Sequence, residues 1–256
     1  MELQEIVPWG RSFEEYRRMF GLSGEDLSGR TLGCGDGPAS FNAEATAAGH
    51  DVVSCDPIYS FAAEDIRRRV EETYETVLSQ VRLHPERFVW DFFRDADDLG
   101  QPRLAAMHRF LGDFDRGKQE GRYLVASLPR LPFAEGAFRL ALVSHLLFLY
   151  SGHLDAAFHL ESAFELLRVA GEVRVFPLLT LDRRVSPHIE PVSSALEAAG
   201  YTVEVVAVPY EFQRAEGQAG GRMLRAYRRE GSRGESARSG VRNSGIRVYH
   251  GDRNPG

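Results

Sequence analysis

Cysteine and lysine are both scarce in this chain. The 256 residues include two cysteines, Cys34 and Cys55, which are too few for a disulfide scaffold or a four-cysteine zinc site. Lys118 is the only lysine, and it is not followed by Ser or Thr. The chain therefore has no Gly-Lys-Ser/Thr phosphate loop, and a Walker-type nucleotide site is excluded.

Long apolar runs are absent as well. The first sixteen residues, MELQEIVPWGRSFEEY, are acidic and hold no apolar stretch, so they do not resemble a signal peptide. The longest apolar run, 140–150, contains Ser144 and His145 and is too short to span a bilayer. We therefore expect a cytoplasmic protein with no membrane association, as a monomer or a homodimer.

Basic residues are fewer than acidic residues and are unevenly distributed along the chain. Asp and Glu number 37 against 31 Lys and Arg, a net charge of −6, which disfavours a nucleic-acid binder. Residues 222–256 hold nine arginines against three acids, a net of +6, which leaves −12 for 1–221. An acidic body repels phosphates, so a small-molecule partner is favoured. Residues 230–256 are polar and rich in Arg, Gly and Ser, and we expect a disordered tail there.

Short apolar runs alternate with amphipathic stretches along most of the chain. Such alternation with short links predicts a mostly parallel α/β sheet with helices on both faces. A hairpin-like end adds one antiparallel edge strand. The expected strands are 30–33, 51–55, 123–127, 138–144, 172–178, 201–208 and 221–228, and the expected helices between them are 39–48, 155–169 and 192–199.

Residues 59–120 interrupt this alternation. The segments 61–82 and 101–114 have helical patterns, and an aromatic-rich stretch separates them. We interpret 59–120 as a helical insertion that caps the α/β core. An N-terminal lid helix is expected within 1–24, and 1–229 is expected to form a single domain.

The strongest functional signal is a glycine-rich turn. Residues 31–41, TLGCGDGPASF, place Gly33, Gly35 and Gly37 between an expected strand and an expected helix. Glycine permits a tight turn and a close approach of the backbone to a ligand at the helix N-terminus. Asp56 ends the next expected strand, 19 residues after Gly37, where a carboxylate can accept hydrogen bonds from both hydroxyls of a ribose.

The spacing of these glycines distinguishes between nucleotide-like ligands. A dinucleotide fingerprint, G-x-G-x-x-G/A, puts Pro38 in its third place if it starts at Gly33. It puts Ser40 there if it starts at Gly35, so neither choice fits. A G-x-G-x-G turn without a pyrophosphate site favours S-adenosylmethionine (SAM).

Several further motifs are shared with a known group of proteins. The group shows a leading Trp-Gly-Arg, the turn ILDCGDGPASFNAEAT, Asp-Pro-aromatic, SLPxLPF, SHxLFLY and EVRxFPL. This chain has WGR at 9–11, TLGCGDGPASFNAEAT at 31–46, DPIY at 56–59, SLPRLPF at 127–133, SHLLFLY at 144–150 and EVRVFPL at 172–178. Over roughly 25–228 it thus resembles the class I SAM-dependent methyltransferases, and within them an uncharacterised bacterial group of small methyltransferases. The resemblance implies a Rossmann-like, mostly parallel seven-stranded sheet and transfer of the SAM methyl group by in-line displacement.

The resemblance also implies a cofactor site at the carboxyl ends of the strands. Asp56 would hold the ribose, and Ser127 stands where many members carry an Asp for the adenine amine. Ser144 and His145 would face the sulfonium and the acceptor. The other expected cofactor residues are Gly33, Cys34, Gly35 and Gly37 along the methionine part, and Pro57, Ile58 and Leu128 along the adenine.

Two residues depart from the pattern of the group, and one of them, Arg139 in place of an acid near a strand start, is interpreted as structural. Gly33 stands where the group has an acid that helps to organise the amino group of SAM. Two outcomes are open: SAM binds more weakly, or a neighbour such as Asp36 compensates.

The N-terminal segment and the strand-end loops supply the remaining candidates. Trp9, Arg11 and Tyr16 either fold over SAM as a lid, with Arg11 on the methionine carboxylate, or belong to an ordinary packing helix. His145 is the candidate general base, and a supporting hydrogen-bonded histidine is the alternative. No His/Cys/Asp cluster has metal-ligand spacing, so no metal is expected. The residues expected to bind the acceptor are Tyr59, Tyr150, His153 and His188.

Three functions remain open at this point. The first is methyl transfer from SAM to a small molecule, which the acidic charge of 1–221 favours. The second is binding of SAM or S-adenosylhomocysteine without transfer, which Gly33 motivates. The third is methylation of RNA or protein, with the Arg-rich tail as an electrostatic arm.

Overall fold

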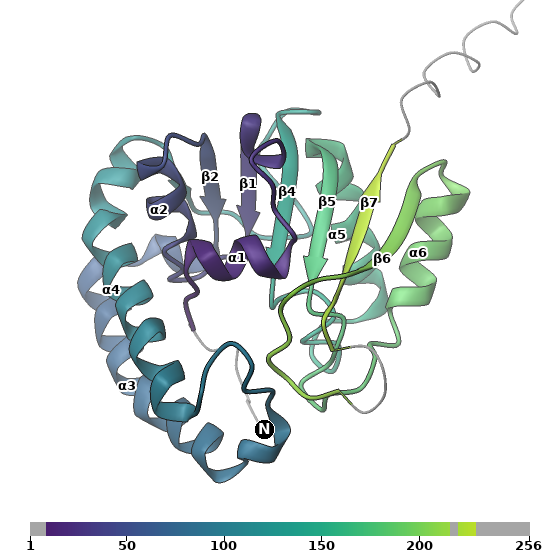
Figure 1. Ribbon diagram of the computed structural model, residues 1–256. Helices are drawn as coiled ribbons and strands as arrows, with labels where there is room; N and C mark the ends of the chain where they lie inside the picture. The colour runs from purple at the N-terminus through teal and green to yellow at the C-terminus, as the bar shows by residue number, and fades with distance from the viewer. Residues whose placement is uncertain (1–8, 216–219, 229–256) are drawn as a thin grey trace, which may run out of the picture.

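A seven-stranded sheet forms the centre of the protein in a computed structural model that describes residues 9–215 and 220–228. Its strands are β1 (Thr31–Cys34), β2 (Val52–Cys55), β3 (Tyr123–Leu124), β4 (Phe138–Ser144), β5 (Ala170–Phe176), β6 (Thr202–Ala207) and β7 (Arg222–Tyr227). They are ordered β3-β2-β1-β4-β5-β7-β6 across the sheet (Figure 1).

Strand direction identifies the fold. Every pair from β3 to β5 is parallel, whereas β7 is antiparallel to both β5 and β6. This is the class I SAM-dependent methyltransferase fold, and the predicted fold class is confirmed. The antiparallel strand lies second from the edge, and the outermost strand is β6. The expected antiparallel strand is present as β7, but it lies one strand in from the edge at which the sequence analysis places it, because a hairpin puts its two strands side by side whichever of them joins the sheet.

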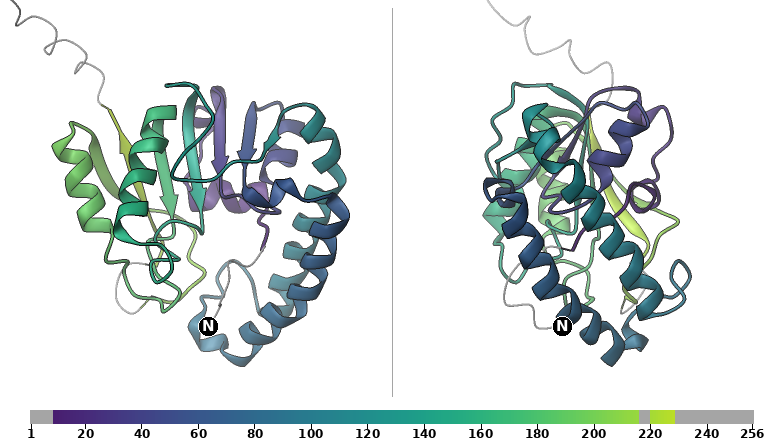
Figure 2. Two further views of the ribbon diagram at one scale, coloured as in Figure 1. Left: turned by 180° about the vertical axis from the view of Figure 1, so that it is seen from behind. Right: turned by 90° about the vertical axis from the view of Figure 1, so that its left-hand side faces the viewer.

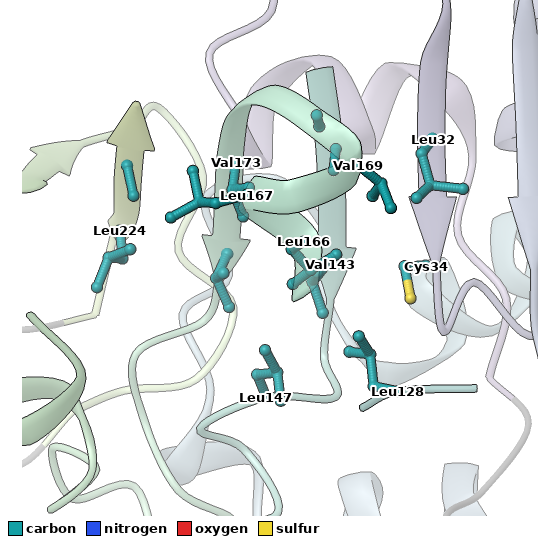
Figure 3. Close-up of a cluster of buried hydrophobic side chains, with 14 of the residues drawn as sticks. Leu32, Cys34, Leu128, Val143, Leu147, Leu166, Leu167, Val169, Val173 and Leu224 are labelled. Atoms are coloured by element: carbon teal, nitrogen blue, oxygen red, sulfur yellow. The ribbon is translucent and has the colours of Figure 1, made fainter. Parts of the chain in front are cut away.

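One face of the sheet is covered by α5 (Ala156–Val169) and α6 (Ile189–Ala198). Leu166 and Leu167 of α5 pack over the buried side chains of β1, β4 and β5, as Figure 3 shows. All residues of β1 and β2 are buried, because helices lie on both sides of these strands.

The opposite face is covered by α1 (Phe13–Met19) and α2 (Phe41–Ala47), and Figure 2 shows both faces. Tyr16 stacks on Phe41 with their ring centroids 4.3 Å apart. A capping box fixes the start of α1: Ser12 Oγ accepts the Glu15 N–H, and the Glu15 carboxylate accepts the Ser12 N–H.

Two long helices occupy the range in which the sequence predicts a helical insertion. They are α3 (Ala63–Leu83) and α4 (Ala96–Gln119), which pack against each other beside the β3 edge. Both extend beyond the carboxyl ends of the strands and form a wall there (Figure 1). Three short 3₁₀ turns, η1 (Asp26–Ser28), η2 (Pro57–Ser60) and η3 (Pro85–Arg87), connect the larger elements.

Some predicted elements differ in extent. The strand predicted at 123–127 stops at Leu124, because the chain then turns and Ser127 pairs with Arg130 in an isolated bridge. The predicted tail, 230–256, lies outside the described residues. Within 9–215 and 220–228, no helix is long and apolar enough to cross a membrane.

Candidate functional site

The glycine-rich turn between β1 and α2 lies at the carboxyl edge of the sheet. Gly35 has a φ of 71° and Gly37 one of 55°, a region that side chains with a Cβ rarely adopt. The Gly35 N–H donates to the Cys55 carbonyl at 2.8 Å, which ties the turn to the end of β2. The turn therefore has a fixed shape, and its backbone lines a cavity.

Asp56 joins this turn to the end of β2. Its Oδ2 accepts the Gly37 N–H at 2.8 Å, and its Oδ1 accepts the Ile58 N–H at 2.9 Å. Burial raises the pKa of Asp56, while the bonds from Ile58 and Gly37 oppose the rise. Each carboxylate oxygen has room for a second hydrogen bond. Asp56 can thus hold the turn and still accept two hydroxyls from a ligand.

Asp36 occupies the space beside Gly33. A Cβ at position 33 would lie 1.8 Å from Asp36 Oδ2. The Tyr16 hydroxyl donates to Asp36 Oδ1 at 2.8 Å, and the Ser54 hydroxyl donates to Oδ2 at 2.6 Å. Burial raises the pKa of Asp36 to about 7, and the Asp56 carboxylate adds to the rise against these two bonds. The Asp36 carboxylate thus fills the space that a side chain at position 33 would occupy.

We expect Gly33→Ala to displace the Asp36 carboxylate, because its oxygen and the new Cβ compete for one space. Loss of the bonds to Tyr16 and Ser54 would cost about 1–3 kcal/mol of unfolding free energy, measurable by urea denaturation. Gly112→Ala in α4 is the control, since its Cβ meets nothing within 4 Å and alanine favours a helix. Equal stability of the two variants would contradict the prediction.

Arg11 brings positive charge to the same edge. Its Nη1 donates to the Trp9 carbonyl at 3.1 Å. Its Nε is buried and has no hydrogen-bond partner within the described part of the chain. Burial lowers the pKa of Arg11 to about 10, and the nearby Arg103 adds to this. An unused N–H on a guanidinium favours the binding of an anion.

A buried ion pair supports the segment that carries Arg11. Arg103 of α4 is 0% exposed, and its Nη2 lies 2.7 Å from Glu15 Oε1. The Tyr210 hydroxyl donates to the same Oε1 at 2.8 Å, and Arg103 Nη1 donates to the Gly10 carbonyl at 3.3 Å. Three segments distant in sequence thus meet in one network.

His145 follows β4 in a left-handed backbone conformation with a φ of 56°. Its N–H donates to the Phe176 carbonyl at 2.7 Å, and its Nδ1 lies 2.9 Å from Ser144 Oγ. Burial lowers the pKa of His145 well below 6.5, and the charges of Arg11 and Arg103 lower it further. The imidazole is therefore neutral at neutral pH, with one nitrogen able to accept a proton. Its role as a general base stays a prediction.

These residues surround a cavity of about 390 Å³ at the carboxyl edge of the sheet. It brings together most of the residues that the sequence predicts for the site. Those that line it are Trp9, Arg11, Tyr16, Cys34, Gly35, Gly37, Asp56, Pro57, Ile58, Ser127, Leu128, Ser144, His145 and Tyr150.

Four predicted residues do not line the cavity. Gly33 lies behind Asp36. Tyr59 is fully buried among aromatic rings, and its hydroxyl donates to the Gly37 carbonyl at 2.9 Å, so it supports the turn from behind. His153 is exposed, and the ring of His188 packs 4.3 Å from that of His159. Tyr59, His153 and His188 were expected to contact the acceptor, but none of them lines the cavity.

The far side of the cavity was not predicted from the sequence. Val77 and Val81 of α3, Phe88 beyond it, and Phe212 and Gln213 of the β6–β7 connection line that side. The spacing of Val77 and Val81 indicates one face of a helix but not the partner of that face. Phe212 and Gln213 carry no motif, because only the approach of distant segments brings them to the cavity.

Metal chemistry finds no support in the described residues. Within 9–215 and 220–228, no group of three or more His, Cys, Asp or Glu side chains is placed to hold a metal ion. Cys34 and Cys55 are both buried free thiols in register on neighbouring strands.

Comparison with known proteins identifies one relative by sequence. No family model matches the chain. The uncharacterized protein MJ0045 of Methanocaldococcus jannaschii is 30% identical over 215 residues, which are 84% of this chain and 94% of the relative. The chain belongs to the family of MJ0045. The name of this relative states no activity, so membership of the MJ0045 family leaves the reaction open.

Solved structures with a similar fold are distant in sequence. A possible histamine N-methyltransferase of Thermotoga maritima is 11% identical, over 84% of this chain and 87% of that chain, with a TM-score of 0.39. A putative SAM-dependent methyltransferase of Methanococcus maripaludis is 10% identical, over 84% and 83% of the two chains, with a TM-score of 0.41. Structural similarity at such low TM-scores says nothing about the ligand of this member of the MJ0045 family.

Proposed function

We propose that this chain is a SAM-dependent methyltransferase that acts on a small-molecule acceptor. The order of charges along the cavity supports this most strongly. Arg11 lies near enough to His145, which follows β4, to lower its pKa, whereas Asp36 follows β1, Asp56 and Ile58 follow β2, and Leu128 follows β3; all of them line the cavity, and these strands are neighbours in the order β4-β1-β2-β3. SAM carries a carboxylate, an ammonium, a ribose diol and an adenine in that order.

The residues present fit each part of SAM. The unused Nε of Arg11 would donate to the carboxylate, and Asp36 would accept from the ammonium. Asp56 would accept from the ribose hydroxyls while it keeps its bond to Gly37. Ile58, Leu128 and the backbone near Ser127 would hold the adenine.

The chemistry needs little more than alignment from the protein. When bound, SAM supplies a methyl carbon on a positively charged sulfur, and the lone pair of an acceptor bonds to that carbon as the carbon–sulfur bond breaks toward sulfur. The turn and Asp56 would fix the position of this carbon, and the cavity walls would exclude water. His145 is neutral and would accept the proton of the acceptor. An anion bound to Arg11 would offset one of the two positive charges, those of Arg11 and Arg103, that lower the pKa of His145.

Titration of the full chain with S-adenosylhomocysteine in a calorimeter tests the proposal. We expect binding with one site per chain, and methyl transfer from labelled SAM to a component of a small-molecule extract. Absence of binding would overturn the assignment. Binding without transfer to any small-molecule, RNA or protein pool would favour a protein that binds the cofactor without catalysis.

The pH dependence of binding tests the role of Asp36. Its pKa of about 7 means that it gains negative charge as the pH rises from 6 to 8, which favours a bound ammonium. S-adenosylhomocysteine, which stays protonated at its amino group, should bind about tenfold more tightly at pH 8 than at pH 6. The facing groups Tyr16, Tyr59 and Cys34 have raised pKa values and stay neutral in this range. Asp56 is the other carboxyl group that faces Asp36.

Asp36→Asn is the matched variant for this experiment. It keeps the shape of the side chain and cannot ionise, so its affinity should be lower at pH 8 and nearly flat from pH 6 to 8. A pH profile in Asp36→Asn as steep as that of the natural chain would assign the titration to another group.

A further inference from the structure

The cavity continues past the residues that fit SAM. The charged side chains among its described lining are Arg11, Asp36 and Asp56, and all three belong to the cofactor end. The remaining wall has four sources: α3 with the segment after it, the loop from β4 into α5, Leu181 of the β5–α6 connection, and the β6–β7 connection. These segments form a second end of the cavity.

The wall of the second end is apolar. Val77, Val81 and Phe88 stand on one side, and Leu149 and Phe158 lie on the loop and helix that follow β4. A charged group placed here would lose its hydration without an opposite charge to compensate, and that penalty is large. Aromatic and aliphatic side chains instead favour an apolar ring or chain.

The wall is also tied together before any ligand binds. Phe88 and Gln213 form an antiparallel bridge. Two backbone hydrogen bonds of 2.8 Å flank it: the Val89 N–H donates to the Phe212 carbonyl, and the Arg214 N–H donates to the Arg87 carbonyl. The rings of Phe88 and Phe212 lie 4.8 Å apart. This pairing closes α3 onto the β6–β7 connection, so little conformational entropy remains to be lost on binding.

The second end also has polar groups, among them Tyr150, Gln213 and His145. Gln213 Oε1 is buried and has no hydrogen-bond partner within 9–215 and 220–228. His145 and Gln213 both line the large cavity and a small one beside it, so the two side chains are neighbours. An unsatisfied buried oxygen and an imidazole that border the same cavities favour a ligand that donates a hydrogen bond.

We propose, on the basis of the proposed function, that the acceptor is a neutral, largely apolar ring compound with one hydroxyl or N–H group, which donates to His145 or Gln213. Phe88 and Phe212 hold the ring, and the donor group lies at the junction with the cofactor end. Anionic and cationic acceptors are disfavoured, because the described lining of the second end has no charged side chain to compensate for their lost hydration. Polyhydroxylated acceptors are disfavoured because this mostly apolar wall offers few hydrogen-bond partners.

Four matched probes test this class: 4-propylphenol, 4-propylanisole, 4-propylbenzoate and 4-propylbenzylamine. Each is titrated by calorimetry into the full chain saturated with S-adenosylhomocysteine, whose own binding is measured first. We expect 4-propylphenol to bind about fivefold more tightly than the anisole, which lacks the donor, and about tenfold more tightly than the two ions.

Two variants test whether Gln213 and Phe212 cause these binding preferences. Gln213→Leu should remove most of the difference between phenol and anisole, and Phe212→Ala should weaken both about tenfold. Gln80→Leu is the matched control, since Gln80 also has a buried unpartnered Oε1 but does not line the cavity, and it should leave the difference unchanged.

The outcomes separate the two proposals. Failure of S-adenosylhomocysteine to bind overturns the proposed function, and the probes are then titrated into the free chain. If the cofactor product binds but the ions bind as well as the phenol, or no probe binds, the acceptor class is wrong. An unchanged phenol preference in Gln213→Leu would overturn the role of that oxygen.

Discussion

Asp56→Ala should weaken the binding of S-adenosylhomocysteine by about 100-fold or more. The carboxylate would accept two ribose hydroxyls, and hydrogen bonds to a charged group are worth about 1.5–3 kcal/mol each. The variant also frees the Gly37 N–H, which Asp56 Oδ2 holds at 2.8 Å, so the turn loses one of its two ties to the end of β2 and keeps the Gly35–Cys55 bond. Both effects reduce affinity.

Asp56→Asn separates these two effects. The amide keeps one oxygen and the size of the side chain but loses the charge, so we expect an intermediate loss of about tenfold. Calorimetric titration gives both dissociation constants, and urea unfolding shows how much stability each variant has lost.

Asp51→Ala is the control for a lost carboxylate near the same strand. Asp51 precedes β2 at the opposite edge of the sheet, is exposed, and lies 3.8 Å from Arg30 in a surface pair. Its removal should leave affinity unchanged. An Asp56→Ala protein that binds as tightly as Asp51→Ala would overturn the placement of the ribose.

Arg103→Met is expected to lower the unfolding free energy by about 3–5 kcal/mol. Arg103 is 0% exposed and Glu15 is 1% exposed, so the substitution leaves a carboxylate buried without its cation. The Tyr210 hydroxyl, which donates to Glu15 at 2.8 Å, cannot replace a full positive charge. Urea denaturation followed by circular dichroism measures the loss.

Arg109→Met provides the matched control on the same helix. Arg109 pairs with Glu44 at 2.7 Å, but its side chain is 58% exposed, so its removal should cost no more than about 1 kcal/mol. The double variant Arg103→Met with Glu15→Leu should be more stable than Arg103→Met alone, because it removes the unpaired charge. Equal losses for Arg103→Met and Arg109→Met would show that the buried pair contributes little.

The part of the cavity at the carboxyl ends of β1 and β2 was largely predictable because its residues are local in sequence. Gly35, Gly37 and Asp56 follow directly after β1 and β2, and parallel strands bring their carboxyl ends to one edge. Once the turn is recognised, the place of Asp56 follows from topology alone. The motifs that point to SAM are therefore readable without coordinates.

The sequence left open whether the Asp36 carboxylate lies in the space beside Gly33, for a geometric reason. Position 33 and Asp36 are three residues apart, and a side chain can reach back only if the turn brings it there. The bonds from Tyr16 and Ser54, which come from a different helix and strand, hold the Asp36 carboxylate in that place. Contacts of this kind arise only in the folded chain.

The sequence by itself determined the alternating α/β architecture, the glycine turn and the strand-end acid, since each depends on short-range patterns. Only the tertiary structure decided that β7 lies between β5 and β6, that Arg103 and Glu15 form a buried pair, and that Phe88 and Phe212 meet in the apolar wall of the cavity. Those features join segments distant in sequence, and their partners are chosen by the packing of the whole molecule.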